Sequence, residues 1–178
     1  MKATGIVRRI DDLGRVVIPK EIRRTMRIRE GDPLEIYTTP EGEVIFKKYS
    51  PIGEIQSCAS QYADVLSKMC GLPALICDCD HVVAAAGLPK KDVLERRITP
   101  PLEQAMEARK CLSGQEAAAL QPVEGVDKTA LAVCPVVSSG DVAGCVLLLA
   151  PSPDTAAGEV QTKLAQAAAA FLGRQLEE

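Results

Sequence analysis

The chain has 178 residues and a mass of 19.0 kDa, which is enough for one ordinary domain or two small ones. Hydrophobic residues make up 47% of the chain, but only 3% are aromatic and tryptophan is absent, so aliphatic and alanine side chains must fill the core. The net charge of −3, taken alone, argues against nucleic acid as a partner, but it is an average over two parts of the chain with different charge. Residues 1–50 carry 11 basic and 8 acidic side chains, whereas residues 51–178 carry 10 and 16. This asymmetry predicts a basic N-terminal part whose role differs from that of the acidic remainder.

The sequence also argues against a secreted protein and against a membrane protein. The chain opens on charged, alternating residues instead of an apolar leader, and no apolar run approaches the roughly 20 residues that span a bilayer. The longest run, Val142 to Ala150, is interrupted by Gly144 and is typical of a buried strand. Seven cysteines, an odd number, fit no closed disulfide framework. We therefore expect a cytoplasmic protein with reduced thiols.

The N-terminal part predicts strands on either side of one short helix. Asp11-Asp12-Leu13-Gly14 has the composition of a tight turn between the first two strands. Pro19 ends the second strand and suits the first position of a helix, where its missing N–H costs nothing. The predicted elements are strands at residues 4–10 and 15–18, a helix at 20–28, and a hairpin of strands at 34–39 and 44–48.

The small size of this N-terminal part predicts that it folds as a dimer. About fifty residues bury too small a fraction of their surface to be secure alone. Four short strands would also leave open edges. Both problems are solved if two copies interleave their strands, so we expect an obligate dimer.

Arginine side chains in the N-terminal part are the strongest functional signal. Arg8 and Arg9 lie on the first predicted strand, Arg15 follows the turn, and Arg23 and Arg24 lie on the predicted helix. Guanidinium groups are permanently charged and pair with phosphates or guanine edges through two parallel hydrogen bonds. A merely solvated helix face is the alternative interpretation. The addition of Arg8 and Arg15, with little acidic compensation, favours a DNA-binding surface, which dimerisation would double.

Residues beyond a short linker at 51–56 predict an α+β domain. An antiparallel sheet is expected between helices from both ends of this segment. The predicted elements are a helix at residues 53–70, strands at 74–77 and 81–86, helices at 92–98 and 102–110, a hairpin of strands at 129–137 and 142–149, and a helix at 159–176.

Several segments of the N-terminal part resemble the DNA-binding domain of AbrB-type transition-state regulators. The matching segments are residues 1–8, 12–19, 21–25, 34–37 and 47–49. The resemblance implies a β-rich swapped-hairpin barrel with one short helix, built from two intertwined chains, over residues 1–50. It also implies DNA-contacting roles for Arg8, Arg15, Arg23 and Arg24. Arg9 stands where that family often has lysine, which implies a lesser phosphate contact.

The order of elements in the C-terminal part is similar to that of a GAF domain, over residues 57–178. GAF domains often bind small molecules on one face of their sheet, which implies a pocket lined by Ile76, Val83 and Ala85, with residues 98–112 and 131–137. A filled pocket that serves only assembly is the alternative, because fold-level likeness does not establish a ligand. The first and last helices of this fold commonly pair two domains, which together with the N-terminal dimer implies a homotetramer.

Cysteine and histidine residues give little support for a metal or an enzyme. Cys77, Cys79 and His81 are close in the sequence, but zinc sites usually use two ligand pairs at wider spacing. We therefore expect no metal and no cofactor. Cys79 lies at a predicted turn, where it is the candidate for an exposed, redox-sensitive thiol. A GAF-type thiol reductase or redox sensor, which the basic part would only localise, stays as an alternative if two cysteines converge beside an open pocket.

The combination of the two parts resembles a family of regulators of late sporulation genes. We therefore predict a sequence-selective regulator that binds double-stranded DNA, both activates and represses, and is not an enzyme. A small molecule at the GAF-like domain is expected to modulate it.

Overall fold

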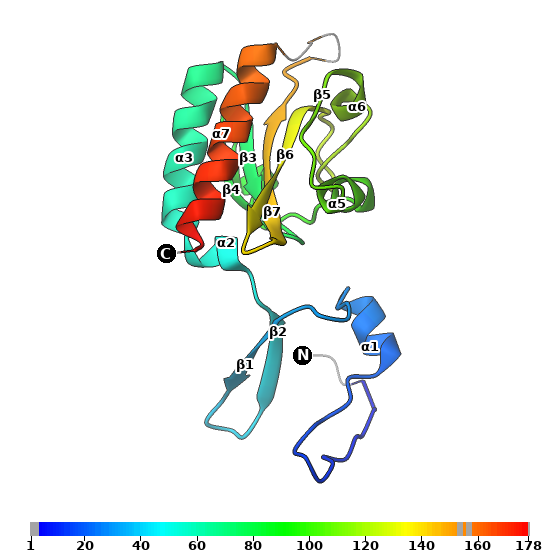
Figure 1. The fold of residues 1–178 in the computed structure, drawn as a ribbon. Helices are drawn as coiled ribbons and strands as arrows, with labels where there is room; N and C mark the ends of the chain where they lie inside the picture. The colour runs from blue at the N-terminus through cyan, green and yellow to red at the C-terminus, as the bar shows by residue number, and fades with distance from the viewer. Residues whose placement is uncertain (1–3, 153–154, 156–157, 178) are drawn as a thin grey trace. The chain divides into compact units, whose positions relative to one another are not determined.

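A computed structural model describes residues 4–152, 155 and 158–177 of the chain. It divides into two compact units, Met1–Tyr49 and Ser50–Glu178. We refer to the first as the head and to the second as the body (Figure 1).

The head holds one short helix and one hairpin. Helix α1 spans Lys20–Thr25, and strands β1 (Leu34–Thr38) and β2 (Val44–Lys48) pair antiparallel, with Ile36 opposite Phe46. Helix α1 is shorter than the helix predicted at residues 20–28. Its end is a Schellman motif, in which Ile28 N donates to Arg23 O at 2.8 Å and Arg27 N donates to Arg24 O at 3.3 Å. Arg27 takes the left-handed conformation that this motif requires, with φ of 52°, so the helix cannot continue.

Residues 4–18 form no strand in the structure, contrary to the two strands predicted there. The predicted turn between them is present, because Gly14 has φ of 75° and its N–H donates to Asp11 O at 3.0 Å. A strand is defined by hydrogen bonds to a neighbouring strand, and a single copy of the head supplies none to these segments.

Apolar side chains of the head remain largely outside any core. Among its described residues only Pro19 and Ile28 are buried. The large hydrophobic side chains exposed on the head are Ile6, Val7, Ile10, Leu13, Val16, Val17, Met26, Ile36, Tyr37, Val44 and Tyr49. A single head therefore lacks the buried apolar surface that normally stabilises a fold.

The body is built on a five-stranded antiparallel sheet in the order β4-β3-β7-β6-β5. The strands are β3 (Ala74–Cys77), β4 (Val82–Ala86), β5 (Leu112–Ser113), β6 (Ala130–Ser138) and β7 (Asp141–Leu149). Helices α3 (Gln56–Cys70) and α7 (Glu159–Gln175) cover one face, while α4 (Lys90–Val93), α5 (Pro100–Glu107) and α6 (Gly114–Ala118) lie over the other (Figure 1). The sheet is therefore buried on both faces, which explains its nearly continuous apolar strands. The α+β architecture agrees with the prediction.

The long helices of the body follow the predicted apolar periodicity. Helix α3 buries Ala59, Ala63 and Leu66, and α7 buries Ala168 and Leu172 among others. These are the three- and four-residue spacings of one helix face. Alanine at these positions allows both helices to lie close to the sheet and to each other.

The start of the body is a separate short helix, α2 (Pro51–Glu54), and not the beginning of one continuous helix. Ser50 caps it, because its Oγ accepts a hydrogen bond from Gly53 N at 3.1 Å. Ile52 is fully buried and lies against Gly144 on β7. The predicted linker at 51–56 thus contains a helix that packs on the sheet.

The region between β4 and β6 differs most from the prediction. The helix predicted at residues 92–98 ends at Val93, because Leu94 is extended and Glu95 has φ of 60°. Residues 95–98 instead form backbone hydrogen bonds with residues 80–82 beside β4, including Val82 N to Arg96 O at 3.0 Å. Strand β5 and helix α6, of two and five residues, were not predicted, since such short elements carry little periodicity.

Candidate nucleic-acid interface

The turn before Arg15 is organised by one carboxylate. Asp11 Oδ1 accepts the backbone N–H of Leu13 at 3.0 Å and that of Arg15 at 2.8 Å, while Asp11 Oδ2 pairs with Arg15 Nε at 2.8 Å. The backbone N–H and then the guanidinium of Arg15, followed by the Leu13 N–H, hold the pKa of Asp11 below its usual value. Asp11 thus fixes the orientation of the Arg15 side chain through Nε. The two terminal nitrogens of the guanidinium group take no part in this ion pair.

Helix α1 carries the two arginines that the sequence placed there. Arg24 is exposed, whereas Arg23 is half-buried and its Nε is a buried atom without a hydrogen-bond partner among the described residues. Both lie in the last turn of α1, where a positive charge is favoured by the helix dipole. An unpaired guanidinium N–H is costly to bury, so this placement of the Arg23 Nε is unfavourable in the single head.

The remaining predicted contacts, Arg8 and Arg9, lie on the extended segment before the turn and are exposed. Arg8 Nη1 donates weakly to the carbonyl of Val7 at 3.5 Å. The structure thus places all five arginines on the head with Arg15 oriented by its turn. Of these five, only Arg23 and Arg24 share a helix.

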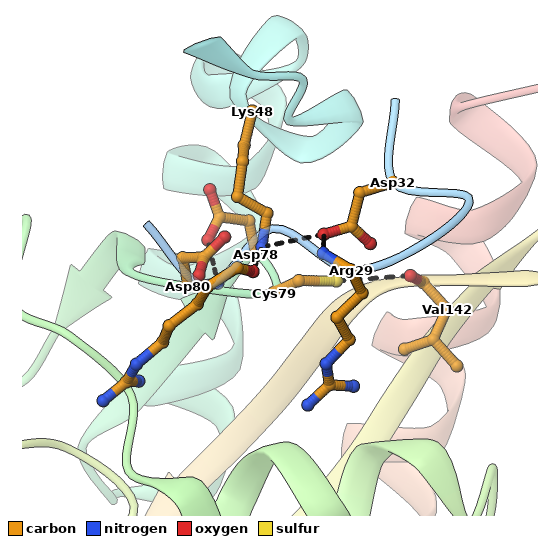
Figure 2. Close-up of polar contacts among 8 residues, drawn as sticks. Arg29, Asp32, Lys48, Asp78, Cys79, Asp80 and Val142 are labelled. Carbon is orange, nitrogen blue, oxygen red and sulfur yellow. Dashed lines mark hydrogen bonds and ion pairs between the residues drawn. The ribbon is translucent and has the colours of Figure 1, made fainter. Parts of the chain in front are cut away.

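An ion pair and two hydrogen bonds join the loop after α1 to the end of β2. Asp32 Oδ2 accepts the backbone N–H of Arg29 at 2.8 Å and pairs with Lys48 Nζ at 3.4 Å (Figure 2). Lys48 Nζ also donates to the carbonyl of Arg27 at 3.1 Å. Sequence reasoning missed this structural role of Lys48 and Asp32, which holds α1 and its arginines relative to the hairpin of the same head.

The three residues predicted to line a ligand pocket in the body do not share a face of the sheet. Ile76 and Val83 pack in the cluster under α3 and α7, whereas Ala85 packs in the opposite cluster, under α4 to α6. The cause is a β-bulge. Ala84 pairs with Ile76 and Val82 with Cys77, which leaves Val83 as the extra residue and reverses the alternation beyond it.

The segments predicted to join that pocket divide in the same way. Ile98, Leu102 and Met106 pack with Ala85, whereas Leu131 and Val136 pack with Ile76. Only part of the predicted lining therefore lies on the α4–α6 side of the sheet.

The Cys77–His81 segment is a turn held by Asp78. Asp78 Oδ1 accepts the backbone N–H groups of Asp80 and His81 at 2.7 and 2.6 Å, and Oδ2 accepts Ser50 Oγ at 2.7 Å. Cys79 Sγ donates to the carbonyl of Val142 at 3.3 Å (Figure 2). Cys79 is therefore half-buried and packed on β7, not the exposed thiol that was predicted. Within the described ranges, no three His, Cys, Asp or Glu side chains gather as metal ligands.

No helix in the described part of the chain is long and apolar enough to cross a membrane.

Comparison with known proteins finds matches for both parts of the chain. Residues 54–177 match the family described as stage V sporulation protein T C-terminal, transcription factor, and residues 7–54 match the family of the bacterial antitoxin MazE, described as antidote-toxin recognition. Stage V sporulation protein T of Bacillus subtilis (strain 168) is 52% identical over 180 residues, which cover 100% of both chains. The transition state regulatory protein AbrB of the same organism is 63% identical over 51 residues, which are 29% of this chain and 52% of AbrB.

The body also resembles solved GAF domains. The GAF domain of a phosphoenolpyruvate-protein phosphotransferase from Acinetobacter matches 73% of this chain and 84% of its own, with a TM-score of 0.56 and 12% identity. At this identity the likeness establishes the GAF fold and nothing about a ligand.

Proposed function

This chain belongs to the stage V sporulation protein T family, and from that premise we propose that it is a DNA-binding transcriptional regulator that activates some late sporulation genes and represses others. The observation that carries the proposal is the 52% identity over the whole chain, together with a head that is 63% identical to part of a transition state regulatory protein. We propose no enzymatic role. A regulator of this kind acts on the chromosome, so we place the protein in the cytoplasm.

The arginines of the head are proposed to bind double-stranded DNA. Arg8, Arg15, Arg23 and Arg24 are the main contacts and Arg9 a lesser one. Arg15 is oriented by Asp11, and Arg23 and Arg24 lie together in the last turn of α1, where their guanidinium groups would pair with phosphates or base edges. Affinity would come largely from phosphate neutralisation, and specificity in part from DNA shape, because few other side chains are available to read bases.

Two heads are proposed to form the DNA-binding unit. The segments at residues 4–18 lack strand partners, and apolar side chains such as Val7, Ile10 and Val17 are exposed in the single chain. Interleaving two copies would supply both the missing ladder hydrogen bonds and a shared core. It would also place two sets of arginines on one assembly.

Binding to DNA tests the proposed function directly. The full-length protein is titrated against fluorescently labelled duplexes from upstream regions of late sporulation genes and against a scrambled duplex. We expect a Kd of about 10⁻⁸ M for the specific duplex, which is about 10³-fold tighter than for the scrambled one. Binding should weaken as the salt concentration rises. Equal affinity for both duplexes would reject sequence-selective regulation.

The bodies are proposed to pair through α3 and α7, which makes the dimer of heads a homotetramer. Large apolar side chains point outward from these helices, namely Val65 and Met69 on α3 and Val160 and Phe171 on α7. Phe171 also stacks on Tyr62, with ring centroids 5.1 Å apart, so apolar side chains of the two helices are in contact beside these exposed positions.

A charge on this surface is expected to divide the tetramer. Val65 is 55% exposed in the single chain, so Val65→Asp should leave the fold of the body intact while it places a carboxylate in the proposed interface. Multi-angle light scattering should then give the mass of a dimer. Lys91→Asp, at an exposed position of α4 over the opposite face of the sheet, provides a charge-changing control that should stay tetrameric. A tetramer in Val65→Asp would contradict this interface.

A small-molecule effector is proposed to bind the body on the α4–α6 side of the sheet. Ala85, Ile98 and Leu102 belong to the apolar cluster there, and the cover consists of short helices and irregular segments. Such a cover rearranges around a ligand more readily than two long helices do. A ligand that binds only the folded body raises its Tm by mass action, so a thermal-shift screen of metabolites tests the proposal. The absence of any stabilising compound in that screen would favour a body that serves assembly alone.

A further inference from the structure

Two pairs of cysteines face each other across neighbouring strands of the body. Cys77 on β3 is directly opposite Cys145 on β7. Cys111 immediately precedes β5, and the register of Leu112 with Val133, continued by one residue, places Cys111 opposite Cys134 on β6. Residues directly opposite in an antiparallel pair have Cα atoms about 4.5–5.5 Å apart, which lies inside the range that a disulfide spans.

The two side chains of each pair pack on the same face of the sheet, and all seven cysteines are thiols in the structure. Burial, followed by a hydrogen bond to Cys111, raises the pKa of the Cys134 thiol. A hydrogen bond to Cys77, followed by burial, raises the pKa of the Cys145 thiol. In each pair the two cysteines therefore lie close together, and one of the two thiols, Cys134 or Cys145, has a raised pKa.

Access from solvent distinguishes the two pairs. Cys77, Cys145 and Cys134 are each 0% exposed, whereas Cys111 is half-buried in the loop after α5. An attacking thiol must reach its partner molecule, and of the two pairs only Cys111–Cys134 includes a residue that is partly exposed to a solute. Arg109 and Lys110 precede Cys111 and are exposed. Arg109 Nη2 lies 3.9 Å from Asp141 Oδ1, so the positive charge that attracts an anionic solute to this loop is mainly that of Lys110.

We propose that Cys111 and Cys134 form a reversible redox-modification site that reacts with low-molecular-weight disulfides. The Cys111 thiolate attacks one sulfur of the small disulfide, which forms a mixed disulfide and releases one small thiolate. Cys134 then attacks the sulfur of Cys111, displaces the second small thiolate and gives up its proton to that departing thiolate. The protein loses two electrons and two protons, and the small disulfide gains them as two thiols.

The disulfide would fasten a weakly attached part of the body. Strand β5 has two residues, and it connects the α5 loop to α6 at the edge of the sheet. A covalent bond from Cys111 to β6 would hold this edge in place and close a loop between residues 111 and 134. Oxidation should therefore raise the Tm of the body, because the cross-link restricts the unfolded chain.

Glutathione disulfide provides the test on the native full-length protein. After incubation, alkylation and mass spectrometry, we expect a Cys111–Cys134 cross-linked peptide and a mass loss of about 2 Da, both reversed by dithiothreitol. Cys77 and Cys145 should become alkylated, as thiols, only when the protein is unfolded. They form the internal control, because they share the cross-strand geometry but not the exposure.

Three variants separate the steps of the reaction. Cys134→Ala should stop at the mixed disulfide on Cys111, with a gain of about 305 Da, because the resolving thiol is missing. Cys111→Ser should give neither product, and Cys79→Ser should react like the wild type. A stable glutathione adduct on Cys111 in the wild type, or cross-linking of Cys77 to Cys145 first, would overturn the proposal. Cys111→Ser keeps the test valid if Cys134→Ala fails to fold.

Discussion

Arg24→Ala is expected to weaken binding of the protein to its specific DNA about 100-fold while the oligomer persists. Arg24 is exposed at the last turn of α1, so its removal takes no apolar side chain out of the core. Each dimer of heads loses two guanidinium groups. The slope of log Kd against log salt should therefore fall by about two, since about one counterion fewer is released for each lost phosphate contact.

Arg23→Ala should have an effect of similar size on binding, with a different secondary signature. Arg23 is half-buried, and its unpaired Nε carries a desolvation cost in the free protein. Removing the guanidinium should therefore leave the free protein as stable as before, or slightly more stable. Arg23→Lys keeps the charge but loses the planar fork, so it should restore the salt slope more than the specificity.

The matched control is Arg97→Ala, which removes an exposed arginine from the body. It changes the net charge by the same amount, so any general effect of charge on DNA affinity appears in both variants. Fluorescence anisotropy at several salt concentrations measures the affinities. If Arg24→Ala bound with the affinity and salt slope of Arg97→Ala, the head arginines would not be the DNA contacts.

The elements that the sequence predicted well are those whose hydrogen bonds or burial are local or strongly periodic. Helix α7 and the β6–β7 hairpin combine length with an apolar pattern, and the turn at Asp11 carries its own capping carboxylate. The strands predicted at residues 4–18 depend on partners that one copy of the head does not supply. Their absence in the single chain thus has the same physical cause as the exposed apolar surface around them.

The candidate sites also differ in how far the sequence alone could predict them. The arginines of the head could be named as candidate DNA contacts from the sequence, because a charge cluster is visible without knowledge of the fold. The pocket residues could not, since one bulge at Val83 places Ile76 and Ala85 on opposite faces of the sheet. A one-residue irregularity reverses every later side chain, and nothing in the alternation of VVAAA at residues 82–86 signals it. The cysteine pairs likewise required the strand register.

Gly144→Ala is expected to destabilise the body severely, by about 3 kcal/mol or more in the free energy of unfolding. A Cβ at residue 144 would lie 2.0 Å from the carbonyl oxygen of Cys77, 2.5 Å from Cδ1 of Ile52 and 3.0 Å from Cα of Asp78. Two of these three atoms belong to the backbone of the β3 end and its turn, so a side-chain rotation cannot relieve the overlap. The β3–β7 pairing itself has to shift, and with it the turn that Asp78 organises for Ser50 and α2.

Urea unfolding followed by far-UV circular dichroism measures this effect, and two further variants identify its cause. Gly158→Ala makes the same chemical change at the N-cap of α7, where the new Cβ meets the mobile end of Gln161, so it should cost well under about 1 kcal/mol. Adding Ile52→Ala to Gly144→Ala removes the contact with Cδ1 but leaves the Cys77 carbonyl in place. The double variant should therefore be no more stable than Gly144→Ala. Full rescue by Ile52→Ala would show instead that the close approach of α2, and not the strand pairing, requires glycine at this position.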